Sequence, residues 1–126
     1  MPKASIGVAA SLLVAASATG VSAADEFKLD YRIERTEATK LSLAQCTQIL
    51  RQTAQAMAIP VSVSDESLPA VAVFGGLGDG KGSIVAYCIT AGDKTVHLVQ
   101  GIGYRPGSMV AAYADRAHRS LLEASK

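Results

Sequence analysis

The two cysteines of the chain, Cys46 and Cys88, lie in segments with different periodicities, and their pairing would restrict the fold more than any other feature. Cys46 belongs to a run in which apolar residues recur at helical spacing up to Met57, preceded by Ser42 in the pattern of a capping box. Cys88 belongs to SIVAYCIT, an apolar segment typical of a strand. A disulfide between them would fix a helix against a sheet, provided that the chain enters an oxidising compartment.

The N-terminal segment has the pattern of a secretory signal peptide. Lys3 precedes an apolar stretch of small residues that ends in Val21-Ser22-Ala23, an A-x-A-like cleavage site. We expect cleavage after Ala23, with Ala24 as the alternative, which leaves residues 24–126 as a single small domain. The stretch is shorter and less leucine-rich than a membrane span of about 20 residues, so we expect no stable membrane anchor after cleavage. A periplasmic location is predicted, with full secretion as the alternative.

Export favours a disulfide between Cys46 and Cys88, because paired thiols oxidise outside the cytoplasm. The functional alternatives are a redox pair and a metal site. The chain has no C-x-x-C motif, and its two histidines are not spaced with the cysteines as metal ligands. We therefore predict a structural disulfide and no metal or cofactor.

The charge of the mature chain disfavours two classes of partner. Removing Lys3 lowers the number of basic residues from 12 to 11, and all 11 acidic residues remain. Nucleic acids and anionic membrane surfaces require a basic excess or a basic stripe. We expect the partner to be another protein or a second copy of the chain, and no nucleic acid.

The remaining periodicities predict an α+β fold. FKLDYRIER alternates strictly, with Phe27, Leu29, Tyr31 and Ile33 on one side, which indicates a half-buried antiparallel strand whose charged side faces water. Short strands follow the first helix, then a hairpin around residues 91–94 and a last helix after Ser108. We predict a small antiparallel sheet of four to five strands, two helices packed on one face, chain order βαβββ(β)α, and one disulfide.

The strand that contains Cys88 is apolar on both sides. If Cys88 faces the helices, Val85, Tyr87 and Ile89 face the other way, and we expect His97 and Val99 of the next strand to share that second face. One layer of helices covers only one face of a sheet. The second face would be covered by residues 66–82, by a second subunit or by a separate partner, and we predict an interaction surface there.

The stretch GGLGDGKGS, residues 75–83, resembles part of a phosphate-binding loop. In that motif a Ser or Thr follows the lysine and a helix begins there, but here Gly82 follows Lys81 and the next segment has strand character. We interpret it as a glycine-rich connection between two strands, able to form a flexible lip at a binding surface.

No standard catalytic motif is present, and no spacing links the serines, histidines and acidic residues into a catalytic set. A weak candidate for anion or ligand binding is Gly103, Arg105 and Ser108, because the last helix begins there. The leading hypothesis is a non-catalytic exported protein that acts through protein–protein interaction, as an inhibitor, an immunity-like protein or an accessory factor. The alternative is a periplasmic ligand-binding protein or hydrolase, with a site formed by the glycine-rich loop, Arg105 and His97.

Overall fold

The computed structural model describes residues 27–126 of the chain, and the predicted signal peptide and its cleavage site at Ala23 or Ala24 lie outside the described residues. These residues form five strands and two helices, and four of the strands follow one another between the two helices. The elements are β1 (Lys28–Glu37), α1 (Leu43–Ala56), β2 (Ser62–Val63), β3 (Ala70–Gly76), β4 (Gly82–Ala91), β5 (Lys94–Gly103) and α2 (Val110–Ala124). Among residues 27–126, no helix has the length and apolar character needed to cross a membrane.

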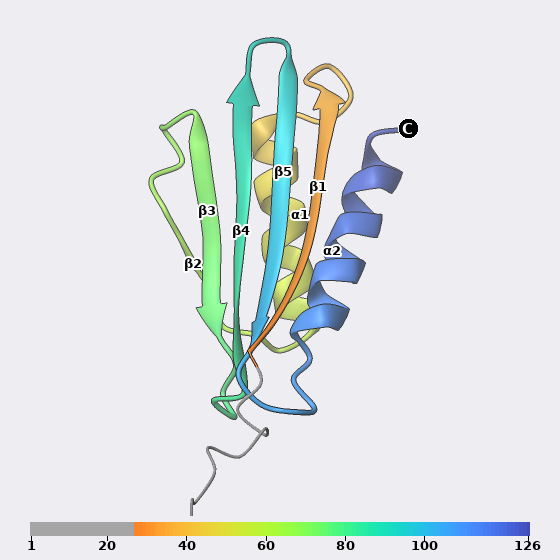
Figure 1. Ribbon diagram of the computed structural model, residues 1–126. Helices are drawn as coiled ribbons and strands as arrows, with labels where there is room; N and C mark the ends of the chain where they lie inside the picture. Colours follow the sequence, from red (N-terminus) through yellow and green to blue (C-terminus); the bar gives the residue numbers. More distant parts are fainter. Residues whose placement is uncertain (1–26) are drawn as a thin grey trace, which may run out of the picture.

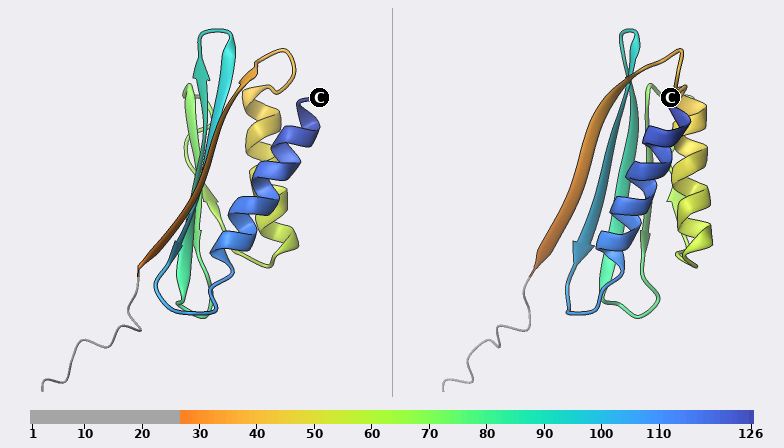
Figure 2. Two further views of the ribbon diagram at one scale, coloured as in Figure 1. Left: turned by 45° about the vertical axis from the view of Figure 1, so that its right-hand side comes forward. Right: turned by 90° about the vertical axis from the view of Figure 1, so that its right-hand side faces the viewer.

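The strands form one antiparallel sheet in the order β1-β5-β4-β3-β2 (Figure 1). Both helices pack against the same face of this sheet, and the opposite face carries no helix in the described part of the chain (Figure 2). The predicted α+β fold, its chain order and the single helical layer are confirmed, with the two-residue β2 as the fifth strand.

Helix α1 begins at a capping box, as the sequence predicts. The backbone N–H of Gln45 donates to Ser42 Oγ at 3.1 Å, and the backbone N–H of Ser42 donates to Gln45 Oε1 at 2.9 Å. The helix ends at Met57, and Ala58 adopts a positive φ of 56° shortly before Pro60. The residues that it buries against the sheet and α2 are Cys46, Thr47, Leu50, Thr53 and Ala54.

A disulfide joins α1 to β4, which confirms the predicted pairing of Cys46 with Cys88. Both side chains are fully buried, and their Cα atoms lie 6.1 Å apart. In a chain with few aromatic residues, this covalent link supplements a core made mainly of aliphatic side chains and Tyr113. The Tyr113 hydroxyl donates to the backbone carbonyl of Leu50 at 3.1 Å, which connects α2 to α1 within that core.

Two glycines let the first turn of α2 approach the sheet closely. A Cβ atom added at Gly101 would lie 2.5 Å from the Val110 carbonyl oxygen, and one added at Gly82 would lie 2.6 Å from Ser108 Oγ. Gly82, which follows the lysine of the loop-like stretch, is therefore a packing residue at the start of β4. The preceding turn is closed by a hydrogen bond from the Lys81 N–H to Asp79 Oδ1, and no helix follows it. The predicted connection between two strands is confirmed.

Candidate functional site

The side of the sheet that faces away from the helices is apolar across four strands, and we call it the open face. It is formed by alternate residues of each strand, and antiparallel pairing brings them into transverse rows. Its apolar side chains are Leu29, Tyr31 and Ile33 on β1, Val96, Leu98 and Ile102 on β5, Val85, Tyr87 and Ile89 on β4, and Ala72 and Phe74 on β3.

One row of the open face is apolar across β1, β5, β4 and β3. Ile33 pairs with Leu98, Leu98 with Tyr87, and Tyr87 with Ala72. The largest exposures lie on β1, where Ile33 is 58% and Tyr31 57% accessible, and the values for other apolar side chains are smaller because neighbouring strands shield them. In this row Ile33 is exposed, and Leu98, Tyr87 and Ala72 are partly buried, so each of the four side chains keeps some access to solvent in the described chain.

The open face has a polar end and a polar interruption. At the β4–β5 turn, Lys94 forms an ion pair with Glu37, and Arg35 lies one row closer to the apolar centre. Gln100 lies between Tyr31 and Val85 in the adjacent part of the face. Charged residues at the rim around an apolar centre are the usual arrangement of a protein–protein interface.

The dimensions of the apolar region match the centre of such an interface. Four strands about 4.8 Å apart, over about seven residues of about 3.3 Å each, give a projected area on the order of 450 Å². Side-chain relief makes the accessible area larger than this projection. Monomeric proteins seldom expose more than a few hundred Å² of contiguous apolar surface, whereas specific interfaces bury about 800 Å² on each partner.

Two residues predicted for this surface lie on the other side of the sheet. The hairpin places only Gly92 and Asp93 between the paired residues Ala91 and Lys94, so Cys88 pairs with His97. Directly opposite residues share a face. His97 and Val99 therefore lie under the helices, fully buried, and their predicted placement beside Tyr87 is wrong. The predicted placement of Val85, Tyr87 and Ile89 opposite Cys88 is confirmed.

The facing of β1 also differs from the prediction. The alternation is present from Lys28 to Glu34, but Leu29, Tyr31 and Ile33 lie on the open face, and the charged residues between them lie on the helix side of the sheet. Arg32 is partly buried there, while Ile33 is exposed. The reason is that β1 is an edge strand. Charged side chains on its helix side can therefore reach solvent at the edge of the sheet, beyond the helices (Figure 2). Residues 66–82, which were a candidate cover for the open face, instead contribute β3 to the sheet.

His97 forms a hydrogen bond with His118 of α2, with Nε2 and Nδ1 3.0 Å apart. Burial lowers the pKa of His97 to about 4, and the nearby His118 adds to this shift while the Glu34 carboxylate opposes it. His97 is inaccessible to a substrate in this position. Across residues 27–126 no group of three or more His, Cys, Asp or Glu side chains is arranged to hold a metal ion.

The weak anion-site candidates do come together in space. Gly103, Arg105 and Ser108 line a hollow of about 380 Å³ at the start of α2. Ser108 Oγ accepts a long hydrogen bond of 3.4 Å from the Val110 N–H. Lys28 and Asp30, which have opposite charges, line the same hollow, and His97 is not part of its lining. The grouping of Arg105 with His97 that the ligand-binding hypothesis requires is therefore absent from this hollow.

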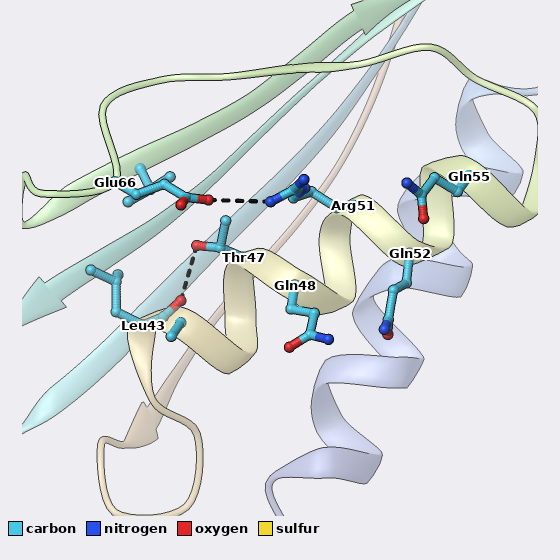
Figure 3. A pocket seen from close by; sticks show the side chains of 9 residues that line it. Leu43, Thr47, Gln48, Arg51, Gln52, Gln55 and Glu66 are labelled. Atoms are coloured by element: carbon cyan, nitrogen blue, oxygen red, sulfur yellow. Dashed lines mark hydrogen bonds and ion pairs between the residues drawn. The ribbon is translucent and has the colours of Figure 1, made fainter.

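A second hollow, of about 660 Å³, lies between α1 and the segment that joins β2 to β3 (Figure 3). Its helical wall is the nearly uncharged outer face of α1, with Gln48, Gln52 and Gln55 pointing outward. Arg51 reaches across it to Glu66 at 3.5 Å. The sequence indicates the glutamines by helical periodicity, but Glu66 comes from a segment whose position relative to α1 only the fold determines.

These features define a small α+β protein with a disulfide in its core, one sheet face covered by helices and one open apolar face. The chain belongs to the family described as "Family of unknown function (DUF6180)", whose model matches residues 26–126. Neither the curated proteins nor the solved structures give a significant match to the chain.

Proposed function

We propose that this chain is an exported, non-catalytic protein that acts by binding another protein through the open face. The observation that carries the proposal is the unbroken apolar row Ile33–Leu98–Tyr87–Ala72, which no part of the described chain covers. Its removal from water on binding would contribute about 25 cal/mol for each Å² of apolar area, before the costs of association are subtracted.

Two further observations support the export and interaction roles. The buried Cys46–Cys88 disulfide suits an oxidising compartment such as the periplasm. The hydrogen-bonded pair His97 and His118 has one member, His97, that is fully buried beneath α2 and inaccessible to a substrate. An inhibitor, an immunity-like protein or an accessory factor would need only the binding surface.

Photo-crosslinking in the producing cells tests the proposal. A photoreactive phenylalanine analogue is placed at Ile33 or Tyr87 on the open face, and at Leu122 on α2 as a control that is also apolar and partly exposed. We expect both open-face positions to crosslink to one and the same protein, and Leu122 to give no such product. Mass spectrometry identifies the product and also shows whether the exported form begins at Ala24.

The identified protein is then purified, and its binding is measured by calorimetry. Ile33→Glu should reduce the affinity at least tenfold, because a carboxylate would be buried in an apolar contact. Leu122→Glu should leave the affinity unchanged. Crosslinking of Leu122 to the same extent as Ile33, or binding that is indifferent to Ile33→Glu, would contradict a role for the open face.

A further inference from the structure

Strand β1 is a long and regular edge of the sheet, and its charged side chains are the feature that protects it from pairing with other strands. Its ten residues pair with β5 on one side only, and no other strand of residues 27–126 lies along its outer side (Figure 2). It contains neither proline nor glycine. Proteins usually block such an edge with a proline, a bulge, a cover or charged side chains, because the free main-chain groups can pair with another strand.

Two hydrogen bonds show which main-chain groups point outward from this edge. The carbonyl oxygen of Tyr31 accepts from the Arg32 guanidinium at 2.8 Å, and the N–H of Arg35 donates to Glu34 Oε1 at 3.0 Å. Both groups are therefore directed away from β5. In an antiparallel pair, every second residue directs both its N–H and its C=O to the same neighbour. Residues 29, 31, 33 and 35 thus present the outward main-chain groups.

The intervening residues alternate in charge. Lys28, Asp30, Arg32 and Glu34 lie on the helix side of β1, with signs plus, minus, plus and minus. No ion pair is formed by any of these four within residues 27–126. Arg32 and Glu34 instead bind outward main-chain groups of β1 itself, and a pairing strand would replace these two hydrogen bonds. The alternating signs therefore specify a charge register along the edge that no ion pair within the described residues uses.

We propose that a second copy of the chain pairs with β1 in antiparallel orientation, on a two-fold axis that passes through Tyr31. In this register Lys28 of each chain faces Glu34 of the other, and Asp30 faces Arg32. All four charged pairs across the axis are then of opposite sign. Opposite charges directly across a strand pair contribute about 0.2–1 kcal/mol each, and like charges are unfavourable.

Neighbouring registers are less favourable. An axis through Arg32 would place Arg32 against Arg32 and Asp30 against Glu34. An axis through Asp30 would place Asp30 against Asp30 and Lys28 against Arg32. An axis through Ile33 or Leu29 leaves only two opposite-sign pairs between these residues. The charge sequence therefore selects Tyr31, whose outward N–H and C=O are the groups that such a pairing requires.

The same register joins the apolar parts of the two copies. Leu29 of each chain faces Ile33 of the other, and the two Tyr31 side chains meet at the axis, all on the open face. Three residue pairs that each exchange two main-chain hydrogen bonds would supply about six such bonds. Because α2 packs over both β5 and β1, the two α2 helices approach each other below the joined strands and enlarge the contact. The inference does not depend on a heterologous partner for the open face.

Charge exchange between two variants provides the test, with sedimentation velocity of the mature chain 24–126 as the measurement. We expect the wild-type chain to dimerise. Asp30→Arg and Arg32→Glu should each weaken the dimer at least about tenfold, since each places two like-charge pairs across the axis. An equimolar mixture of the two variants should regain the wild-type affinity as a heterodimer. In that heterodimer the arginine introduced at position 30 faces the glutamate introduced at position 32, and the native Arg32 of one variant faces the native Asp30 of the other.

Position 31 supplies a matched pair of variants that separates main-chain pairing from side-chain contact. Tyr31→Pro removes an outward N–H that β5 does not use, so the chain should keep its thermal transition and its disulfide while the dimer is lost. Tyr31→Thr removes the ring but retains the N–H, and it should remain dimeric.

Three outcomes would overturn the proposal. The first is that the wild-type chain stays monomeric at about 100 μM, well above the dissociation constant of a specific dimer. The second is that Asp30→Arg and Arg32→Glu dimerise as well as the wild type. The third is that the mixture of these two variants forms no heterodimer. The double variant D30R/R32E restores the complementary signs within one chain, so recovery of its dimer shows that the single variants failed through charge and not through misfolding. A dimer lost in Leu98→Glu but unaffected at positions 30 and 32 would place the second copy on the open face instead.

Discussion

His97 Nε2 and His118 Nδ1 lie 3.0 Å apart and join the middle of β5 to α2 through a hydrogen bond beneath the helical layer. A neutral imidazole has one N–H and one acceptor nitrogen. His97 Nδ1 is buried and has no hydrogen-bond partner within the described residues. A proton on Nδ1 would be a buried N–H without an acceptor. We therefore assign the proton of neutral His97 to Nε2, which donates to His118 Nδ1.

The histidine pair makes stability depend on acidity. Burial lowers the pKa of His97 to about 4, from 6.5 in the unfolded chain, so between these values only the unfolded state binds the proton. The stabilisation from a neutral His97 is complete above pH 6.5 and is lost as the pH falls towards 4. The full loss is on the order of 3 kcal/mol. Urea unfolding of the wild type and of His97→Leu, measured between pH 4 and pH 8, checks this.

The free energy of unfolding is plotted against pH for each protein. The difference between the two curves gives the contribution of His97, because both proteins contain the same carboxylates. Glu34 on β1 and His118 on α2 are the titratable groups near His97, and both are retained in His97→Leu. We expect the free energy of unfolding of the wild type to fall more steeply below pH 6.5. Parallel curves would show that His97 is protonated in the folded state or exposed to water.

Reduction of the Cys46–Cys88 disulfide should cost much of the stability of the domain. The cysteines are 42 residues apart, and closure of a loop of that length corresponds to about 4 kcal/mol in the chain-entropy model. Guanidinium unfolding with and without a phosphine reductant measures the difference. A loss below about 1 kcal/mol would mean that packing of α1 on β4, not the covalent link, limits unfolding.

Gly101→Ala should separate the first turn of α2 from the sheet. The added methyl group would lie 2.5 Å from the Val110 carbonyl oxygen, and backbone atoms cannot move aside as a flexible side chain can. We expect a loss of about 1–3 kcal/mol in the free energy of unfolding. Gly76→Ala is the matched control, since nothing lies within 4 Å of a Cβ atom there, and it should have little effect.

The fold could be predicted from local patterns because each element carries its own signal. The capping box at Ser42, the period of α1 and the hairpin at Gly92 were sufficient for the elements and their class. The Cys46–Cys88 link followed from two cysteines predicted to face inward in a chain predicted to be exported. The orientation of β1 could not be predicted, because alternation shows that two sides differ but not which side the helices cover.

The candidate site was predicted only in part. The two-sided strand indicated Val85, Tyr87 and Ile89, but the width of the open face depends on β1 lying beside β5, which is a contact between segments far apart in the chain. The face on which His97 and Val99 lie is determined by the hairpin. A two-residue turn fixes the pairing of Cys88 with His97, and paired residues share one face of the sheet.

A pair of identical substitutions tests the corrected placement of Val99 directly. Val85 and Val99 lie on adjacent strands, but Val85 is on the open face and Val99 is fully buried under the helices. Replacing Val by Thr keeps the shape and exchanges one methyl group for a hydroxyl group. In Val99→Thr the hydroxyl would be buried in an apolar core, which costs about 1–3 kcal/mol, whereas in Val85→Thr it can reach water and should change stability by less than about 0.5 kcal/mol. Chemical unfolding of the two variants measures both values. Equal losses would mean that the open face is as well shielded from water as the helix-covered face, and would contradict its assignment as a free surface of the monomer.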